Sequence, residues 1–343
     1  MRDATANLRD PWTAYRLRWK RRRLLWRALR ARRGLRPVED RTDGIARGEI
    51  LLFAVMRNEA TRLPHFLRHY RALGVGHMLI VDNGSSDGTA EALAEQADVS
   101  LWSTPDSYKG SRFGLDWLNW LLMLHGHGHW CLTVDADEIL IYPHHDQRDL
   151  HDLAARLEAA GHRAFGALML DLYPSGRLGG QTYVAGDDPF DLLRWFDAVG
   201  YRAVRQPGLR NLWVQGGVRE RCFFANRPRR SPTLNKLPLV KWNRRYAYVN
   251  STHSMLPRRL NLAYDGPDGH APSGVLLHTK FLPSIVERSA EEKVRRQHFG
   301  DPAAFDDYYD GLIDDPVLWS DDSVEFRGWR QLVELGLMSH AGL

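Results

Sequence analysis

Three carboxylates within four residues form the strongest chemical signal in the sequence. Asp135, Asp137 and Glu138 follow the apolar run 130–134. Side chains alternate along an extended chain, so Asp135 and Asp137 point to the same side and can reach one ion. Mg²⁺ and Mn²⁺ prefer oxygen ligands and typically take one or two carboxylates plus substrate phosphates. An acidic turn is the alternative, but the pattern favours a divalent-cation site.

A second polar cluster covers residues 82–89, with the sequence Asp-Asn-Gly-Ser-Ser-Asp-Gly-Thr. Asp82 ends an apolar run, where its carboxylate can accept a hydrogen bond from a ribose or a base. The small residues behind it allow the backbone to approach a ligand closely. The alternative is a strand-to-helix turn in which Asp87 or Thr89 serves as the cap.

Short apolar runs alternate with segments of helical spacing. The runs are 50–56, 77–81 and 130–134, and the helical segments are 62–73, 90–96 and 115–124. This alternation predicts an α/β domain with a mostly parallel sheet flanked by helices. Ligands of such sheets bind beyond the carboxyl ends of the strands. We therefore expect the polar residues that follow the three runs to converge.

Three motifs in series resemble those of GT-A glycosyltransferases, with the best match to the family 2-like branch related to family 92. They are Ala-Val-Met-Arg-Asn-Glu at 54–59, the cluster at 82–89, and Asp-Ala-Asp-Glu at 135–138. Segments 215–221, 236–242, 251–253 and 277–281 also resemble that branch. The resemblance covers about residues 49–282 and implies the GT-A fold.

The resemblance implies metal-dependent transfer of a sugar from a nucleotide-sugar donor to a glycan or lipid-linked acceptor, with inversion. By the same resemblance, Arg57, Glu59 and Asp82 line the nucleoside pocket. Asp135 approaches the ribose and the metal, and Asp137 ligates Mn²⁺ or Mg²⁺ directly.

A histidine late in such domains often completes the metal shell or faces the diphosphate. His278 is the candidate, and His253 is the alternative. Lys236, Lys241 and Lys280 are expected to stabilise the negative charge on the leaving diphosphate.

Inverting transfer also needs a carboxylate that takes the proton of the acceptor hydroxyl. Glu220, which follows Gly-Gly, is the first candidate, and Asp171 is the second. The usual family 2 base lies in an acidic pair that heads a helix, and this sequence has no clean match. The base and the stereochemistry therefore stay open. Loops 174–189 and 226–235 are expected to shape the acceptor pocket.

The charge of the chain is divided unevenly. Residues 1–47 contain 15 of the 47 Lys and Arg but 5 of the 42 Asp and Glu, so they carry +10 and the rest −5. Within 16–36 there are eleven basic residues and no acidic one. This segment predicts a basic helix on an anionic membrane surface, with a solvated or docking helix as the alternative. Nucleic acid is disfavoured because the folded part is not basic.

The expected organisation is a basic arm (1–48), a GT-A-like domain (49–282) and a helical C-terminal extension (283–343). A composition of 43% hydrophobic and 26% charged residues excludes a chain disordered throughout. Two cysteines cannot form a disulfide framework, and we expect both to be buried and reduced. No apolar run spans a membrane and no secretory signal is apparent. We expect a cytoplasmic protein, peripheral at the inner face of the membrane.

Two other functions stay open. The first is a catalytically silent nucleotide-binding protein of the same fold. The second is a membrane or nucleic-acid adaptor that acts through the basic arm.

Overall fold

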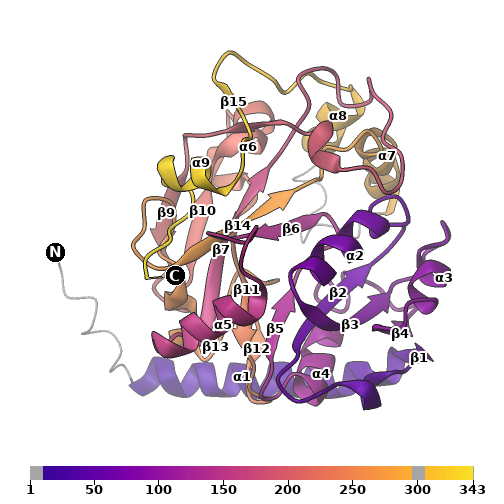
Figure 1. Ribbon diagram of the computed structural model, residues 1–343, viewed down its shortest axis with the longest axis vertical. Coiled ribbons are helices and arrows are strands. Elements are labelled where there is room, and N and C mark those ends of the chain that lie inside the picture. The colour runs from indigo at the N-terminus through magenta and orange to yellow at the C-terminus, as the bar shows by residue number, and fades with distance from the viewer. Residues whose placement is uncertain (1–10, 296–305, 343) are drawn as a thin grey trace.

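The computed structural model describes residues 11–295 and 306–342, and a nine-stranded sheet forms its centre (Figure 1). The strand order is β1-β4-β3-β2-β5-β11-β7-β14-β6. The bounds are β1 Arg36–Glu39, β2 Ile50–Met56, β3 Val75–Asp82, β4 Val99–Ser103, β5 Trp130–Thr133, β6 Glu138–Ile141, β7 Ala164–Asp171, β11 Asn235–Lys241 and β14 Ser273–His278.

Six of these nine strands run in the same direction. They are β2, β3, β4, β5, β7 and β14, whereas β1, β6 and β11 run the opposite way. The prediction of an α/β fold with a mostly parallel sheet is confirmed. The carboxyl ends of the six strands consequently share one edge of the sheet.

Helices cover both faces of the sheet, which explains why its strands read as continuous apolar runs. Leu52 and Ala54 of β2 pack in one core with α2 (Leu63–Ala72), α3 (Thr89–Ala94) and α5 (Leu150–Ala159). Leu51 and Phe53 pack on the other face with α4 (Leu115–His125). Successive residues of β2 thus pack into two different hydrophobic cores, one on each face of the sheet.

The remaining elements surround this sheet. They are β8 Trp195–Asp197, β9 Arg202–Arg205, β10 Leu212–Gln215, α6 Gly217–Phe223, β12 Ala247–Tyr248, β13 Met255–Leu256, α7 Ile285–Arg295, α8 Asp306–Ile313, β15 Ser323–Glu325 and α9 Trp329–Glu334. The C-terminal extension that we expected to be helical contains α7, α8 and α9, and its residues 296–305 and 343 lie outside the described residues.

The basic segment forms α1 (Pro11–Ala31), which packs along the domain instead of standing apart as an arm. Leu24 and Ala28 are buried, and Leu24 joins a small core with residues of β12 and β13. Arg27 donates to Asp116 of α4 at 2.7 Å. The side of α1 that carries Leu24 and Ala28 is therefore its docking face on the domain.

Two further expectations concern burial and membrane crossing. Cys131 is buried as expected, but Cys222 is exposed because it lies on the outer side of α6. Within residues 11–295 and 306–342, no helix has both the length and the apolar character needed to cross a bilayer.

Candidate active site

The polar residues predicted to converge meet at the carboxyl edge of the sheet. Arg57 follows β2, Asp135 follows β5, and His278 ends β14. Because β6 and β11 run the opposite way, they begin at this edge and bring Glu138 and Lys236 to it. These residues line a cavity of about 870 Å³.

Lys236 holds two of the three motif carboxylates. Its ammonium lies 3.1 Å from Asp135 Oδ2 and 2.7 Å from Glu138 Oε1. Burial opposes the charge on Lys236, but the two carboxylates raise its pKa above the ordinary value. The Asp135 side chain stays 51% exposed, so it still faces the cavity. Lys236 thus fixes the acidic motif to β11.

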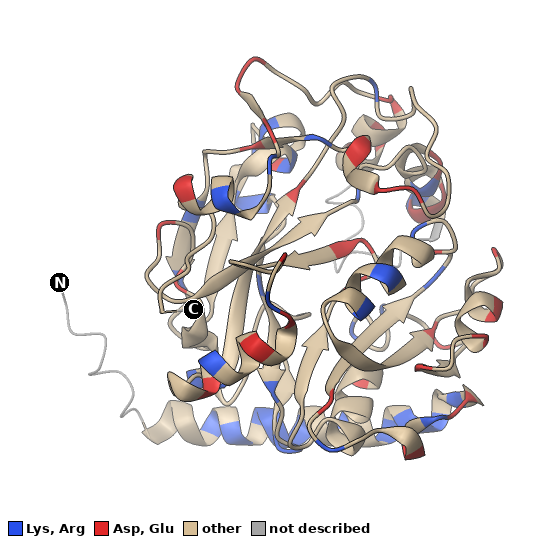
Figure 2. Ribbon diagram, in the orientation of Figure 1, with Lys and Arg blue, Asp and Glu red and all other residues tan. Residues whose placement is uncertain are grey.

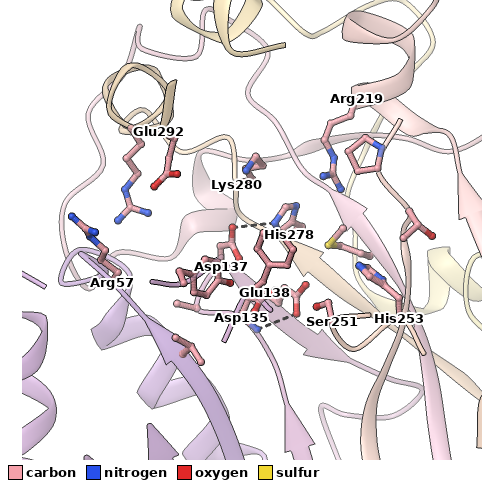
Figure 3. A pocket seen from close by; sticks show the side chains of 18 of the residues that line it. Arg57, Asp135, Asp137, Glu138, Arg219, Ser251, His253, His278, Lys280 and Glu292 are labelled. Atoms are coloured by element: carbon pink, nitrogen blue, oxygen red, sulfur yellow. Dashed lines mark hydrogen bonds and ion pairs between the residues drawn. The ribbon is translucent and has the colours of Figure 1, made fainter. Parts of the chain in front are cut away.

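His278 bridges two carboxylates from different strands. Its Nδ1 donates to Asp171 at 2.6 Å. Its Nε2 lies 3.0 Å from an oxygen of Asp137, and a dashed line in Figure 3 marks this second contact. Burial opposes protonation, but Asp137 and Asp171 raise the pKa of His278. Asp171 also accepts from Arg219 at 2.7 Å. A buried chain therefore runs from Arg219 through Asp171 and His278 to Asp137.

Cationic groups stand close to Asp137. Burial opposes its ionisation, but His278, Arg62 and Lys280 hold the pKa of Asp137 well below its usual range. Among the described residues the Lys280 ammonium has no ion-pair partner, and Arg219 Nη2 is buried without a hydrogen bond. Figure 3 shows Lys280 and Arg219 on the same side of the cavity as His278. These groups leave positive charge available for an anion.

His253 lines the same cavity from a different segment. Its Nδ1 donates to the backbone carbonyl of Asn235. Burial and the nearby Lys236 lower the pKa of His253 to about 3, so it is neutral. His278, not His253, contacts Asp137, and this contact favours His278 as the histidine of the metal site.

Helix α7 closes one side of the cavity. Glu59 binds Arg62 at 3.0 Å and Arg288 of α7 at 2.8 Å. Arg57 binds Glu291 of α7 at 3.3 Å. Arg57 and Glu59, two of the three residues predicted at the nucleoside, thus line the cavity but pair with their neighbours, and the expected extension contributes α7 to the cavity wall.

Asp82 is buried in its own turn. Its carboxylate accepts from the backbone N–H of Gly84 at 3.0 Å and of Ser85 at 3.1 Å. Its neighbour Asn83 lines the cavity, whereas Asp82 does not.

Lys241 and Glu220 are not brought to the cavity. Lys241 lies five residues beyond Lys236 on β11, or about 17 Å at 3.3 Å per residue, and pairs with Glu158. Glu220 forms an ion pair with Arg202 and accepts from Ser231 at 2.7 Å. Because β11 runs antiparallel to its neighbours, Lys241 lies at the opposite edge of the sheet from Lys236. This position corrects the expectation that Lys241 helps to stabilise the diphosphate.

Several residues that line the cavity were not among the predicted site residues. They are Arg62, Tyr108, Lys109, Arg112, Arg219, Ser251 and Arg288. A signal for Arg219 existed, because Asp171 lies in a wholly apolar strand and a buried carboxylate needs a cationic partner. Of the two expected acceptor loops, residues 229–233 line the cavity and residues 174–189 do not.

The donor set fits a divalent cation that substrate oxygens complete. No three His, Cys, Asp or Glu side chains among the described residues form a ready metal-binding group. Asp137 is 24% exposed and Asp135 51% exposed, and both line the cavity. One or two carboxylates plus phosphate oxygens are the usual protein sites of Mg²⁺.

Comparison with known proteins adds little to this geometry. No protein-family model matches the sequence, and no curated protein matches it. Among solved structures, one similar chain is the mannosyltransferase PcManGT from Pyrobaculum calidifontis in complex with GDP-Man and Mn²⁺. The two chains are 19% identical with a TM-score of 0.28, and the match covers 45% of this chain and 44% of that one. A likeness this partial carries no argument about function.

Proposed function

We propose that this protein is a metal-dependent glycosyltransferase that moves a sugar from a nucleotide-sugar donor to a glycan or lipid-linked acceptor. One observation carries the proposal. Asp137 lies at the carboxyl edge of the sheet, bonded to His278, on the wall of a cavity of about 870 Å³. That volume lies within the roughly 300–1,000 Å³ of ordinary ligand pockets.

The charges around Asp137 suit a diphosphate leaving group. A bound Mg²⁺ or Mn²⁺ would supply Lewis-acid stabilisation of the diphosphate, held by Asp137 and Asp135. Lys280 and Arg219 place positive charge in the same part of the cavity. Charges that are fixed before the reaction stabilise a developing negative charge without reorganisation.

The nucleoside would lie between β2 and α7. Because Arg57 and Glu59 are paired with α7, their role in this proposal is to hold the helix against the nucleoside. The acceptor would enter beside residues 229–233, which add Arg229 and Arg230 to the wall.

The test is nucleotide-dependent thermal stabilisation of the wild type and of Asp137→Asn. A ligand at 100 times its Kd stabilises the folded state by about 2.7 kcal/mol, which raises Tm by on the order of 5 °C. We expect this shift with a nucleoside diphosphate and Mn²⁺, and its metal-dependent part should vanish in Asp137→Asn.

The matched control is Asp43→Asn, which changes an exposed aspartate in a short 3₁₀ turn remote from the cavity lining. This variant should keep the full shift. An unchanged metal-dependent shift in Asp137→Asn would overturn the proposed site.

A second candidate function is nucleotide binding without transfer. It is favoured by the placement of Glu220 and Asp171, because each carboxylate is engaged in an ion pair outside the cavity lining. The base and the inversion therefore remain predictions. A coupled assay that measures the release of nucleoside diphosphate from a nucleotide-sugar donor separates the two functions. Metal-dependent binding with no release would select the silent protein.

A further inference from the structure

The outward face of α1 carries a stripe of aromatic rings. At about 100° per residue, Trp12, Tyr15, Trp19 and Trp26 fall within about 60° of one another, on the side of the helix opposite Leu24. The four rings are 66%, 51%, 52% and 57% exposed, in that order. Large apolar side chains gathered on one exposed face indicate a binding surface.

Arginines accompany these rings. The guanidinium of Arg22 lies 5.2 Å from the ring centre of Trp19, and that of Arg30 lies 4.8 Å from that of Trp26. Helix α1 contains eight basic residues and no acidic one. Figure 2 shows the resulting blue bands along the helix. We call Trp12, Tyr15, Trp19, Arg22, Trp26 and Arg30 the aromatic–arginine stripe.

The chemistry of the stripe matches the boundary of an anionic bilayer. Tryptophan and tyrosine favour the headgroup level, where one end of the ring is apolar and the other is wet. Arginine pairs with lipid phosphates, and an amphipathic basic helix lies in the plane of the interface. A 21-residue helix is about 31 Å long, so all four rings can touch one surface.

The charge of the helix argues against the other occupants. A second copy would bring two strongly basic helices together, which like charges oppose. Sites for single-stranded nucleic acid combine a basic groove with stacking rings, whereas this stripe lies on the convex outer side of a docked helix. An anionic surface satisfies both the rings and the arginines.

We propose that the aromatic–arginine stripe binds the surface of an anionic phospholipid bilayer, with α1 parallel to the membrane. Because Leu24 and Ala28 pack on the domain, the helix and the sheet attach to the membrane as one body. Asp116 accepts from Arg27 of α1 and from Arg112 of the cavity wall, so the helix that carries the stripe is tied to the cavity wall. Membrane binding by the stripe does not depend on glycosyl transfer.

The test is co-sedimentation of the full chain with vesicles of phosphatidylcholine alone or with about one-third phosphatidylglycerol. We expect binding to the anionic vesicles, with partitioning reduced on the order of tenfold between low and high salt because salt screens exposed charges. The double variant Trp19→Ala/Trp26→Ala and the double variant Arg22→Gln/Arg30→Gln should each lose on the order of tenfold in partitioning.

The matched control combines Trp319→Ala with Arg259→Gln, two exposed positions that do not belong to α1. It should bind the anionic vesicles as the wild type does, and circular dichroism should show the native fold in every variant. Equal vesicle binding by the stripe variants and the wild type would overturn the proposal. The proposal would also be overturned if the wild type did not bind the anionic vesicles. Self-association of the wild type in light scattering, or its binding to a nucleic-acid probe, would then identify the other occupant of the stripe.

Discussion

His278 contacts two carboxylates that each lie more than a hundred positions before it in the chain, and its contacts redefine the role of Asp171. That carboxylate accepts from His278 and Arg219 and lies outside the cavity lining. A carboxylate behind a histidine fixes the orientation of the ring that faces a metal. Asp171 is therefore better placed to position His278 than to take a proton from an acceptor.

Replacing Asp171 with Asn tests this positioning role. The change leaves Arg219 buried beside a neutral group, so we expect the free energy of unfolding in urea to fall by about 3–5 kcal/mol. Metal-dependent nucleotide affinity should fall on the order of 10- to 100-fold. The control Glu220→Gln disrupts a pair whose Arg202 side chain is 41% exposed and should cost about 1 kcal/mol. Full stability with loss of turnover alone would instead identify Asp171 as the base.

At the scale of elements, α2 carries a histidine whose surroundings keep it neutral. His69 donates from Nε2 to the carbonyl of Leu140 in β6 at 2.9 Å. Burial lowers the pKa of His69 from 6.5 to about 4, against the effect of that hydrogen bond. The contact between α2 and the sheet therefore depends on an unprotonated ring.

This depressed pKa predicts a pH-dependent stability. Between pH 6.5 and about 4 the unfolded chain binds a proton that the folded His69 does not, so stability is complete above pH 6.5 and falls as the pH drops towards 4. The loss is on the order of 3 kcal/mol. His69→Gln keeps a donor without titrating, and its urea unfolding should show a correspondingly flatter pH dependence. An identical pH profile in the two proteins would contradict the assignment.

At the scale of the whole molecule, α1 is part of the fold. Its inner face contributes Leu24 to a core with Ala247, Val249 and Leu256. Deletion of the segment would therefore damage the domain as well as any membrane contact, and point variants are the sharper probes.

Leu24→Ala should lower the free energy of unfolding by about 2–3 kcal/mol, because it leaves a cavity where the helix docks. Leu29→Ala is the matched control. Leu29 lies on the same helix but is 39% exposed, so its loss should change stability by no more than about 0.5 kcal/mol. Equal urea midpoints for the two variants would show that α1 does not dock as described.

Much of the sheet and part of the site were predictable from local patterns. Strands buried on both faces are mostly apolar, so Ile50–Met56 and residues 77–81 of β3 are visible as runs. Where such a run ends, polar residues such as Asp135 and Asp137 stand out. The prediction that they meet at one edge follows from the common direction of the strands.

The sequence by itself determined three strands of the sheet (β2, β3 and β5), the helices α2, α3 and α4 and the acidic motif, because these depend on residues close together in the chain. Only the tertiary structure decided which neighbour faces the cavity: Arg219 and not Glu220, Lys236 and not Lys241. It likewise decided that the leucine face of α1 is buried and its aromatic face exposed. The physical reason is the same throughout. A side chain's direction is set by the surface against which its element packs, and local spacing does not specify that surface.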